Sequence, residues 1–177
     1  MAASSRPPPP RWCGILDPSQ ILTELHDGVV NALKKQDHDS ETLDGMEIAL
    51  CSYNLKTNVL EFASARRPLL LITNNKPEVI KGGRFPIGLI IKGDRKYPTH
   101  TFKLKPNDTF YIFTDGYCDQ FGGIGGKKFM FNRLYRLILD KQNLPMNEQA
   151  DVISNAIDQW KTGWPQIDDM LVMGVRI

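Results

Sequence analysis

Hydrophobic residues along this chain follow two patterns, short apolar runs and repeats at helical spacing. The short runs, separated by asparagine and glycine, predict strands at 46–53, 59–63, 69–73, 78–81, 99–105 and 108–114. Because several of these runs are joined by short turns, we expect hairpins and an antiparallel sheet. The run 108–114 is almost wholly apolar, so we expect it to be buried on both faces.

Helical spacing occurs in three places. The first predicted helix begins at Asp17, which can cap it, with Pro18 at the first helical position. Its apolar residues fall on one face: Ile21, Leu25, Val29 and Leu33. Two further helices are predicted at 127–141 and 146–161, and a last strand at 170–177. Strands followed by two helices and a closing strand predict an α+β layered fold.

Length and composition narrow the class of protein. The 177 residues suffice for one domain with a real core, and a net charge of +2 is too small to indicate binding to nucleic acid or an anionic membrane. No apolar stretch approaches the ~20 residues of a membrane span. Three cysteines without CxxC spacing argue against a disulfide framework and favour a reducing, cytoplasmic setting. Residues 1–14 contain four consecutive prolines and are interpreted as a disordered or foreign tail, with the domain at 15–177.

Two acidic positions at strand ends are the strongest candidates for chemistry. Asp115-Gly116 follows the buried run 108–114, and Asp168-Asp169 opens the last strand. Glycine permits a sharp turn that presents the carboxylate, and oxygen ligands suit Mg²⁺ or Mn²⁺. Singly, each carboxylate also fits an ordinary turn or loop residue. Together, they predict one metal site built from distant parts of the chain.

Other polar residues leave alternatives open. Asp119 fits either a group that orients a metal-bound water or a solvated side chain. The glycine-rich segment 122–128 favours a flexible loop over a phosphate contact, because it lacks the Walker pattern. Arg66-Arg67 offers paired donors for a phosphoryl group, although arginines at a surface hairpin are the commoner interpretation.

The remaining candidates are predicted to carry no catalytic role. Asp44, before Gly45, precedes a strand instead of following one, so a structural turn is favoured. The three histidines, His26, His38 and His100, are scattered, without a partner at a recognisable spacing. We also expect nearby carboxylates to raise the pKa of the Cys118 thiol, which is unfavourable for a nucleophile.

An ordered set of motifs resembles a known family. The motifs are Asp44-Gly-Met-Glu-Ile-Ala-Leu-Cys51, Phe62-Ala-Ser-Ala65 followed by Arg66-Arg67-Pro68, Phe85-Pro-Ile-Gly88, Phe110-Tyr-Ile-Phe-Thr-Asp-Gly116, Asp119-Gln-Phe-Gly-Gly123, Gly126-Lys-Lys128 and Asp168-Asp-Met-Leu-Val-Met-Gly174. In order and spacing they resemble the C-terminal part of the stage II sporulation protein E (SpoIIE)-like branch of the PPM metal-dependent serine/threonine phosphatases. The resemblance runs from about Asp17 to Ile177.

The resemblance implies a fold and a chemistry. The family fold is an α-β-β-α sandwich of two antiparallel sheets flanked by helices. Its members use two Mn²⁺ or Mg²⁺ ions to activate a water that attacks a phosphoserine or phosphothreonine. By resemblance, Asp115 and Asp168 are catalytic and bind metal. The family's typical substrates in bacterial regulatory signalling are phosphorylated proteins of the anti-anti-sigma type, which act in sigma factor regulation.

The chain also departs from the family pattern. The family's earlier Gly-Asp pair and its Asp-x-x-Gly-His-Gly-like run, which supply the bridging metal ligand, have no counterpart before Asp17. Ala65-Arg66-Arg67 stands where the family often shows Gly-Ala-Asn. We therefore expect a truncated domain that lacks its first strands, binds one ion or none, and self-associates through the exposed sheet edge. A monodisperse monomer in sedimentation at micromolar concentration would contradict that self-association.

Two alternative functions follow from that departure. The first is a catalytically inactive, phosphatase-like interaction module that keeps the fold. The second is an unrelated, small β-rich binding domain with incidental carboxylates. Mn²⁺-dependent turnover distinguishes the phosphatase from the inactive module, and failure to bind any divalent ion would favour the unrelated domain.

Overall fold

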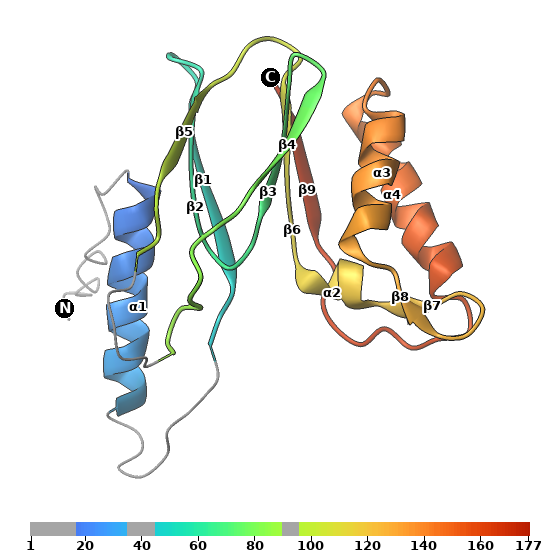
Figure 1. The fold of residues 1–177 in the computed structure, drawn as a ribbon, viewed down its shortest axis with the longest axis horizontal. Helices are drawn as coiled ribbons and strands as arrows, with labels where there is room; N and C mark the ends of the chain where they lie inside the picture. Colours follow the sequence, from blue (N-terminus) through green and yellow to red (C-terminus); the bar gives the residue numbers. More distant parts are fainter. Residues whose placement is uncertain (1–16, 35–44, 90–95) are drawn as a thin grey trace, which may run out of the picture. The chain divides into compact units, whose positions relative to one another are not determined.

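The computed structural model of this chain describes residues 17–34, 45–89 and 96–177 (Figure 1). The chain divides into two compact units, Met1–Arg66 with Gly82–Phe102, and Arg67–Lys81 with Lys103–Ile177. The predicted tail at 1–14, Asp44 and His38 lie outside the described residues. In the part of the chain that is described, no helix combines the length and the apolar character needed to cross a bilayer.

The first unit contains helix α1, Pro18–Lys34, which begins as predicted. The Asp17 carboxylate accepts a hydrogen bond from the backbone N–H of Ser19 at 2.9 Å, which caps the first turn. The buried face is centred one position away from the predicted one. It includes Leu22, His26 and Val30, while the predicted Ile21, Leu25 and Val29 are half-buried. Packing on the sheet decides which of two adjacent rows is buried, and spacing alone does not.

The sheet of this unit has the strand order β1-β2-β5, with β1 at Ile48–Asn54, β2 at Val59–Ala65 and β5 at His100–Lys103. Strands β1 and β2 form the predicted antiparallel hairpin, with Ile48 opposite Ala65. Met46, predicted as the first residue of β1, instead forms an isolated bridge with Ile87. The core of the unit is formed by Leu22, Ala63, Ala65, Ile87 and Tyr97.

The second unit is built on a sheet of order β4-β3-β6-β9. Its strands are β3 (Leu69–Thr73), β4 (Lys76–Ile80), β6 (Thr109–Phe113) and β9 (Val172–Arg176). All three neighbouring pairs are antiparallel, as predicted. Among the described strands, β9 is at one edge of this sheet and β4 is at the other. Self-association through an edge and the loss of earlier strands stay predictions.

Helices α3 (Phe131–Lys141) and α4 (Met146–Trp160) lie side by side in this unit (Figure 1). Their apolar sides join Leu70, Tyr111 and Phe113 of the sheet in one core. Helix α3 begins later than predicted, because Lys127–Lys128 form a short strand, β8, paired with β7 at Phe121–Gly122. A short helix that the sequence did not predict, α2 (Asp115–Asp119), follows β6.

The glycine-rich segment is a packed hairpin and not the flexible loop that was favoured. The backbone N–H of Gly123 donates to the carbonyl of Trp160 at 2.8 Å. A Cβ at Gly122 would lie 2.6 Å from the Trp160 side chain, and one at Gly126 would collide with Trp164. Close approach to two tryptophans therefore accounts for Gly122, Gly123 and Gly126, while Gly125 has open surroundings and a φ of 89°. The α+β class with antiparallel sheets is confirmed.

Candidate active site

Thr114 joins the end of β6 to the acidic segment, which comprises residues 165–171 and carries Asp168 and Asp169. The Thr114 hydroxyl donates to the Asp169 carbonyl at 2.8 Å and accepts from the Leu171 N–H at 2.9 Å. Its own N–H donates to the Leu171 carbonyl at 3.0 Å. Although Thr114 occupies the N-cap position of α2, its side chain makes no capping bond there. The hydroxyl instead fixes the acidic segment next to Asp115.

Gly116 allows the acidic segment to come close. A Cβ at Gly116 would collide with the carbonyl oxygen of Asp169 and would lie 3.1 Å from the Cβ of Asp168. Figure 1 shows the stretch before β9 passing beside α2. The structure therefore places the segment Asp168-Asp169 against Gly116, so that the two motifs that the sequence singled out are neighbours in the fold.

Gln120 holds the acidic segment at a second place. This side chain is fully buried, and its amide nitrogen donates to the Pro165 carbonyl at 2.9 Å. Its amide oxygen accepts a longer bond from the Ile167 N–H at 3.4 Å. Because Thr114 precedes α2 and Gln120 follows it, the two ends of the short helix both anchor the acidic segment.

Helix α2 is itself fixed by Tyr117. The hydroxyl of this buried tyrosine donates to the Ile153 carbonyl of α4 at 2.7 Å. Its ring meets Phe129 edge to face, with the ring centroids 5.3 Å apart. Asp115 is therefore carried by a helix that is locked into the core, although Asp115 itself is exposed.

Arg67 is the charged partner of Asp115. Its Nη2 lies 3.4 Å from Oδ2 of Asp115, with 18% of the arginine side chain and 50% of the aspartate side chain exposed. Arg66, the other member of the predicted pair, pairs with Glu47, with Nε and Oε1 3.2 Å apart. The two arginines therefore do not form one phosphate clamp, and only the second of them lies at the acidic site.

The two other residues that were predicted near the site are accounted for by local contacts. Asp119 pairs with Lys128 of β8 at 2.9 Å, and both side chains are about half exposed. Burial raises the pKa of the Cys118 thiol to about 11, and Asp119 adds to that rise. The predicted direction of this shift is confirmed, but burial is its leading cause and carboxylates come second. Cys118 is therefore unsuited to nucleophilic chemistry at neutral pH.

Asp115 and Asp168 fit a hydrated divalent cation. Hard ions such as Mg²⁺ take oxygen ligands and retain several waters, so one or two carboxylates suffice for binding. The Cβ of Asp168 lies against Gly116, the residue after Asp115, so the two acidic residues come from neighbouring parts of the folded chain. Among residues 17–34, 45–89 and 96–177, no group of three or more histidine, cysteine, aspartate or glutamate side chains gathers around one point.

A match to a family model covers residues 10–177, and the family is described as stage II sporulation protein E (SpoIIE). The chain belongs to the SpoIIE family. This confirms the resemblance drawn from the motifs. No curated protein shows a significant sequence match.

Three solved structures share the fold of this SpoIIE-family chain. The SiaA-PP2C domain of Pseudomonas aeruginosa is 28% identical, with a TM-score of 0.79, and covers 93% of this chain, which spans 63% of that domain's length. The Mn-presoaked phosphatase domain of SpoIIE from Bacillus subtilis is 18% identical, with a TM-score of 0.56, over 99% of this chain and 75% of that one. The PPM Ser-Thr phosphatase MsPP of Mycobacterium smegmatis, in complex with cacodylate, is 13% identical, with a TM-score of 0.52, over 94% and 76%.

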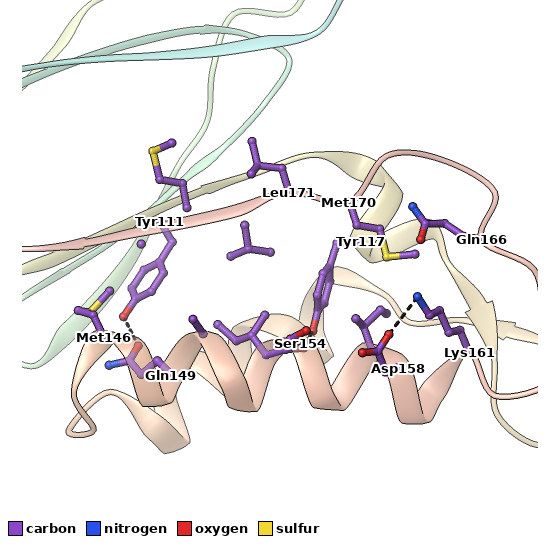
Figure 2. Close-up of a pocket in the computed structure, with 16 residues that line it drawn as sticks. Tyr111, Tyr117, Met146, Gln149, Ser154, Asp158, Lys161, Gln166, Met170 and Leu171 are labelled. Atoms are coloured by element: carbon purple, nitrogen blue, oxygen red, sulfur yellow. Dashed lines mark hydrogen bonds and ion pairs between the residues drawn. The ribbon is translucent and has the colours of Figure 1, made fainter.

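A large cavity of this SpoIIE-family chain borders the acidic segment, since Gln166, Met170 and Leu171 are among the residues that line it. It has a volume of about 550 Å³ and is lined by residues of α4, β6 and β9, among others (Figure 2). Several of its polar groups already have partners: Tyr111 donates to Gln149 at 2.7 Å, and Lys161 pairs with Asp158 at 3.0 Å. Neither Asp115 nor Asp168 lines it. The cavity therefore adds no group to the candidate chemistry.

Sequence reasoning missed the residues that hold the site together. Thr114 and Gln120 were noticed only as members of the motifs around Asp115 and Asp119. A threonine between a strand and an acidic turn is a signal of a side chain that bonds the backbone. The partners Leu171 and Pro165, however, lie 57 and 45 positions away, which local spacing does not reveal.

Proposed function

We propose that this chain carries out the chemistry of its family, the hydrolysis of phosphoserine or phosphothreonine in a regulatory protein with a divalent cation. The observation that carries this proposal is the close approach of Asp168 to Gly116, the residue that follows Asp115 in the chain. Thr114 supports it, because three hydrogen bonds from this one residue hold the acidic segment beside Asp115.

Asp115 and Asp168 would hold Mn²⁺ or Mg²⁺. When bound, such a cation supplies an acidified water and neutralises phosphate charge. Other residues of the chain position the two carboxylates. Gly116 leaves room for the acidic segment, Tyr117 fixes helix α2 to α4, and Gln120 holds the acidic segment at Pro165. Because Asp115 and Asp168 are exposed, a bulky substrate such as a folded phosphoprotein can reach them.

The substrate that this proposal favours is a phosphorylated regulator of the anti-anti-sigma type. Family membership supports that choice. The open site supports it also, since residues 166–169 of the acidic segment are exposed throughout and the described cavity does not include the two carboxylates. We further propose that the protein acts in the cytoplasm, a setting that suits the free thiols of Cys51 and Cys118.

A second function is favoured by the number of ligands. The described residues supply the carboxylates of Asp115 and Asp168 and no cluster of three metal-ligating side chains. A catalytically inactive interaction module would keep the fold and bind one cation weakly. It would recognise the same phosphoprotein without cleaving it.

The test is hydrolysis of a phosphoserine peptide with and without millimolar Mn²⁺. The comparison is between the unmodified chain, Asp115→Asn, and Asp140→Asn as the matched control at an exposed position of α3. We expect Mn²⁺-dependent turnover that Asp115→Asn abolishes and Asp140→Asn leaves unchanged. Mn²⁺ binding without turnover would replace the phosphatase by the inactive module, and absence of both would remove the cation site altogether.

A further inference from the structure

Arg67 occupies an unusual position for an arginine in a connection between strands. It stands between β2 and β3 in the segment Arg66-Arg67-Pro68, where Arg66 takes a positive φ of 68°. The two neighbouring side chains have different partners, Glu47 for Arg66 and Asp115 for Arg67. The Arg66 side chain is 56% exposed, whereas Arg67 keeps only 18% of its side chain accessible. The second arginine is therefore the more buried of the two, and its guanidinium lies beside Asp115.

The ion pair between Arg67 and Asp115 is weak enough for either residue to take another partner. Half of the Asp115 side chain is exposed, so solvent screens the attraction between the two charges. The distance of 3.4 Å is also longer than that of a strong charge-assisted hydrogen bond. A cation at Asp115 can therefore replace the guanidinium without breaking a strong interaction.

A guanidinium beside a cation-binding carboxylate has a clear chemical use. Its planar set of donors matches two oxygens of a phosphoryl group, which a point charge such as the lysine ammonium does not match. A phosphoryl group that approaches the exposed Asp115 comes within reach of Arg67. Burial is the main cause of the raised pKa of Cys118, and the positive charge of Arg67 opposes that rise.

We propose that Arg67 is the phosphate-binding residue of the candidate active site. In the absence of ligand it pairs with Asp115, and in the presence of a phosphoryl group it exchanges the carboxylate for the phosphoryl oxygens. This proposal rests on the proposed function, because it assigns the phosphate to the same cation site. It goes further by naming the side chain that recognises the phosphoryl group.

The test measures binding and does not depend on turnover. Isothermal titration calorimetry gives the affinity of the Mn²⁺-loaded chain for inorganic phosphate, and the affinity of the metal-free chain for Mn²⁺. The variants are Arg67→Met, Arg67→Lys and the control Arg66→Met, whose side chain pairs with Glu47 in the unmodified chain. We expect Arg67→Met to weaken phosphate binding about 10- to 100-fold, since hydrogen bonds to a charged group are lost.

The same substitution is expected to change Mn²⁺ binding in the opposite direction. Without a competing positive charge at Asp115, Arg67→Met should bind Mn²⁺ about two- to tenfold more tightly. Arg67→Lys should lie between the unmodified chain and Arg67→Met for phosphate, because it keeps the charge and loses the planar donors. Arg66→Met should leave both affinities unchanged.

Three results would overturn the proposal. The first is an unchanged phosphate affinity in Arg67→Met. The second is a joint weakening of phosphate and Mn²⁺ binding in that variant, which would indicate a purely structural role. The third is the absence of phosphate binding by the unmodified chain. If Arg67→Met fails to fold by circular dichroism, Arg67→Lys decides by the same criteria. Failure of the proposed function is a separate outcome, because a chain without turnover still reports whether phosphate binding requires Arg67.

Discussion

Two clusters of polar residues, one around His26 in the first unit and one around Asp115 in the second, differ in how far their side chains are exposed to solvent. In the first unit, His26 and Tyr97 are 3% and 2% exposed. The Nδ1 of His26 accepts a hydrogen bond from the Gly88 N–H at 3.1 Å, and the Tyr97 hydroxyl donates to the Pro86 carbonyl at 3.3 Å. In the second unit, the anchoring groups are partly or fully buried, but Asp115 and Asp168 are exposed.

The difference separates a structural cluster from a candidate site. In the His26 cluster, each group bonds another part of the chain and the cluster is closed to solvent. In the acidic cluster, Thr114, Tyr117 and Gln120 direct their hydrogen bonds to backbone groups, which leaves the carboxylates accessible. Burial of a polar residue therefore does not by itself tell a structural group from a functional one. The atoms that remain accessible to solvent must be considered as well.

The largest effect that would sharpen this comparison is expected from Gly116→Ala. The added Cβ would collide with the backbone of Asp169, so the acidic segment must move away from α2. We expect a loss of about 1–3 kcal/mol in the free energy of unfolding, as for other overpacked positions, and loss of Mn²⁺ binding. Thermal unfolding and calorimetric titration with Mn²⁺ measure the two quantities.

Gly28→Ala is the control for that substitution. Nothing lies within 4 Å of a Cβ at Gly28, which sits in the interior of α1. Alanine there should stabilise the protein by roughly 0.5–1 kcal/mol, because it removes the entropic cost of a helical glycine. If Gly116→Ala behaves like Gly28→Ala and retains Mn²⁺ binding, the candidate site does not depend on the close contact of Gly116 with Asp168 and Asp169.

An effect on stability alone, without loss of Mn²⁺ binding, is expected from His26→Phe. The substitution removes the acceptor of the Gly88 N–H in a buried setting, which costs about 1–3 kcal/mol. Mn²⁺ binding at the acidic site should be unchanged, because all of its described anchoring residues lie in the other unit. A chemical denaturation curve and a Mn²⁺ titration of the same variant check both statements. A loss of Mn²⁺ binding in a folded His26→Phe protein would mean that the two clusters are coupled.

The smallest effect concerns the two described cysteines, one in each unit. Burial raises the pKa of Cys51 to about 11, the same value as for Cys118. In the unfolded chain a thiol ionises near pH 9.0, so the folded state binds more protons between these two values. Stability is therefore expected to fall as the pH rises from about 9 towards 11, which denaturation curves across that range would show.

Alkylation by iodoacetamide at about pH 8 tests the same shift directly. Both thiols should react about a hundredfold more slowly in the native protein than in the denatured protein, because the thiolate fraction falls about tenfold per pKa unit. Mass spectrometry of the digested protein separates the two positions. Equal rates before and after denaturation at Cys51 or Cys118 would show that burial does not protect that thiol.

The sequence by itself determined the local elements and the residues proposed for the site. The Asp17 cap, the hairpin of β1 with β2, strand β3 and helix α4 follow from residues close in the chain, where propensity and spacing act. The choice of Asp115 and Asp168 rested on carboxylates at strand ends and on a resemblance to a family to which the chain belongs.

Only the tertiary structure decided how those elements meet. It placed Asp168 against Gly116, made Thr114 and Gln120 the anchors of the acidic segment, and packed the glycine-rich hairpin on Trp160. These outcomes depend on contacts between residues far apart in the chain, whose partners are selected by shape and by hydrogen-bond satisfaction in the folded core. Local periodicity carries no information about such partners.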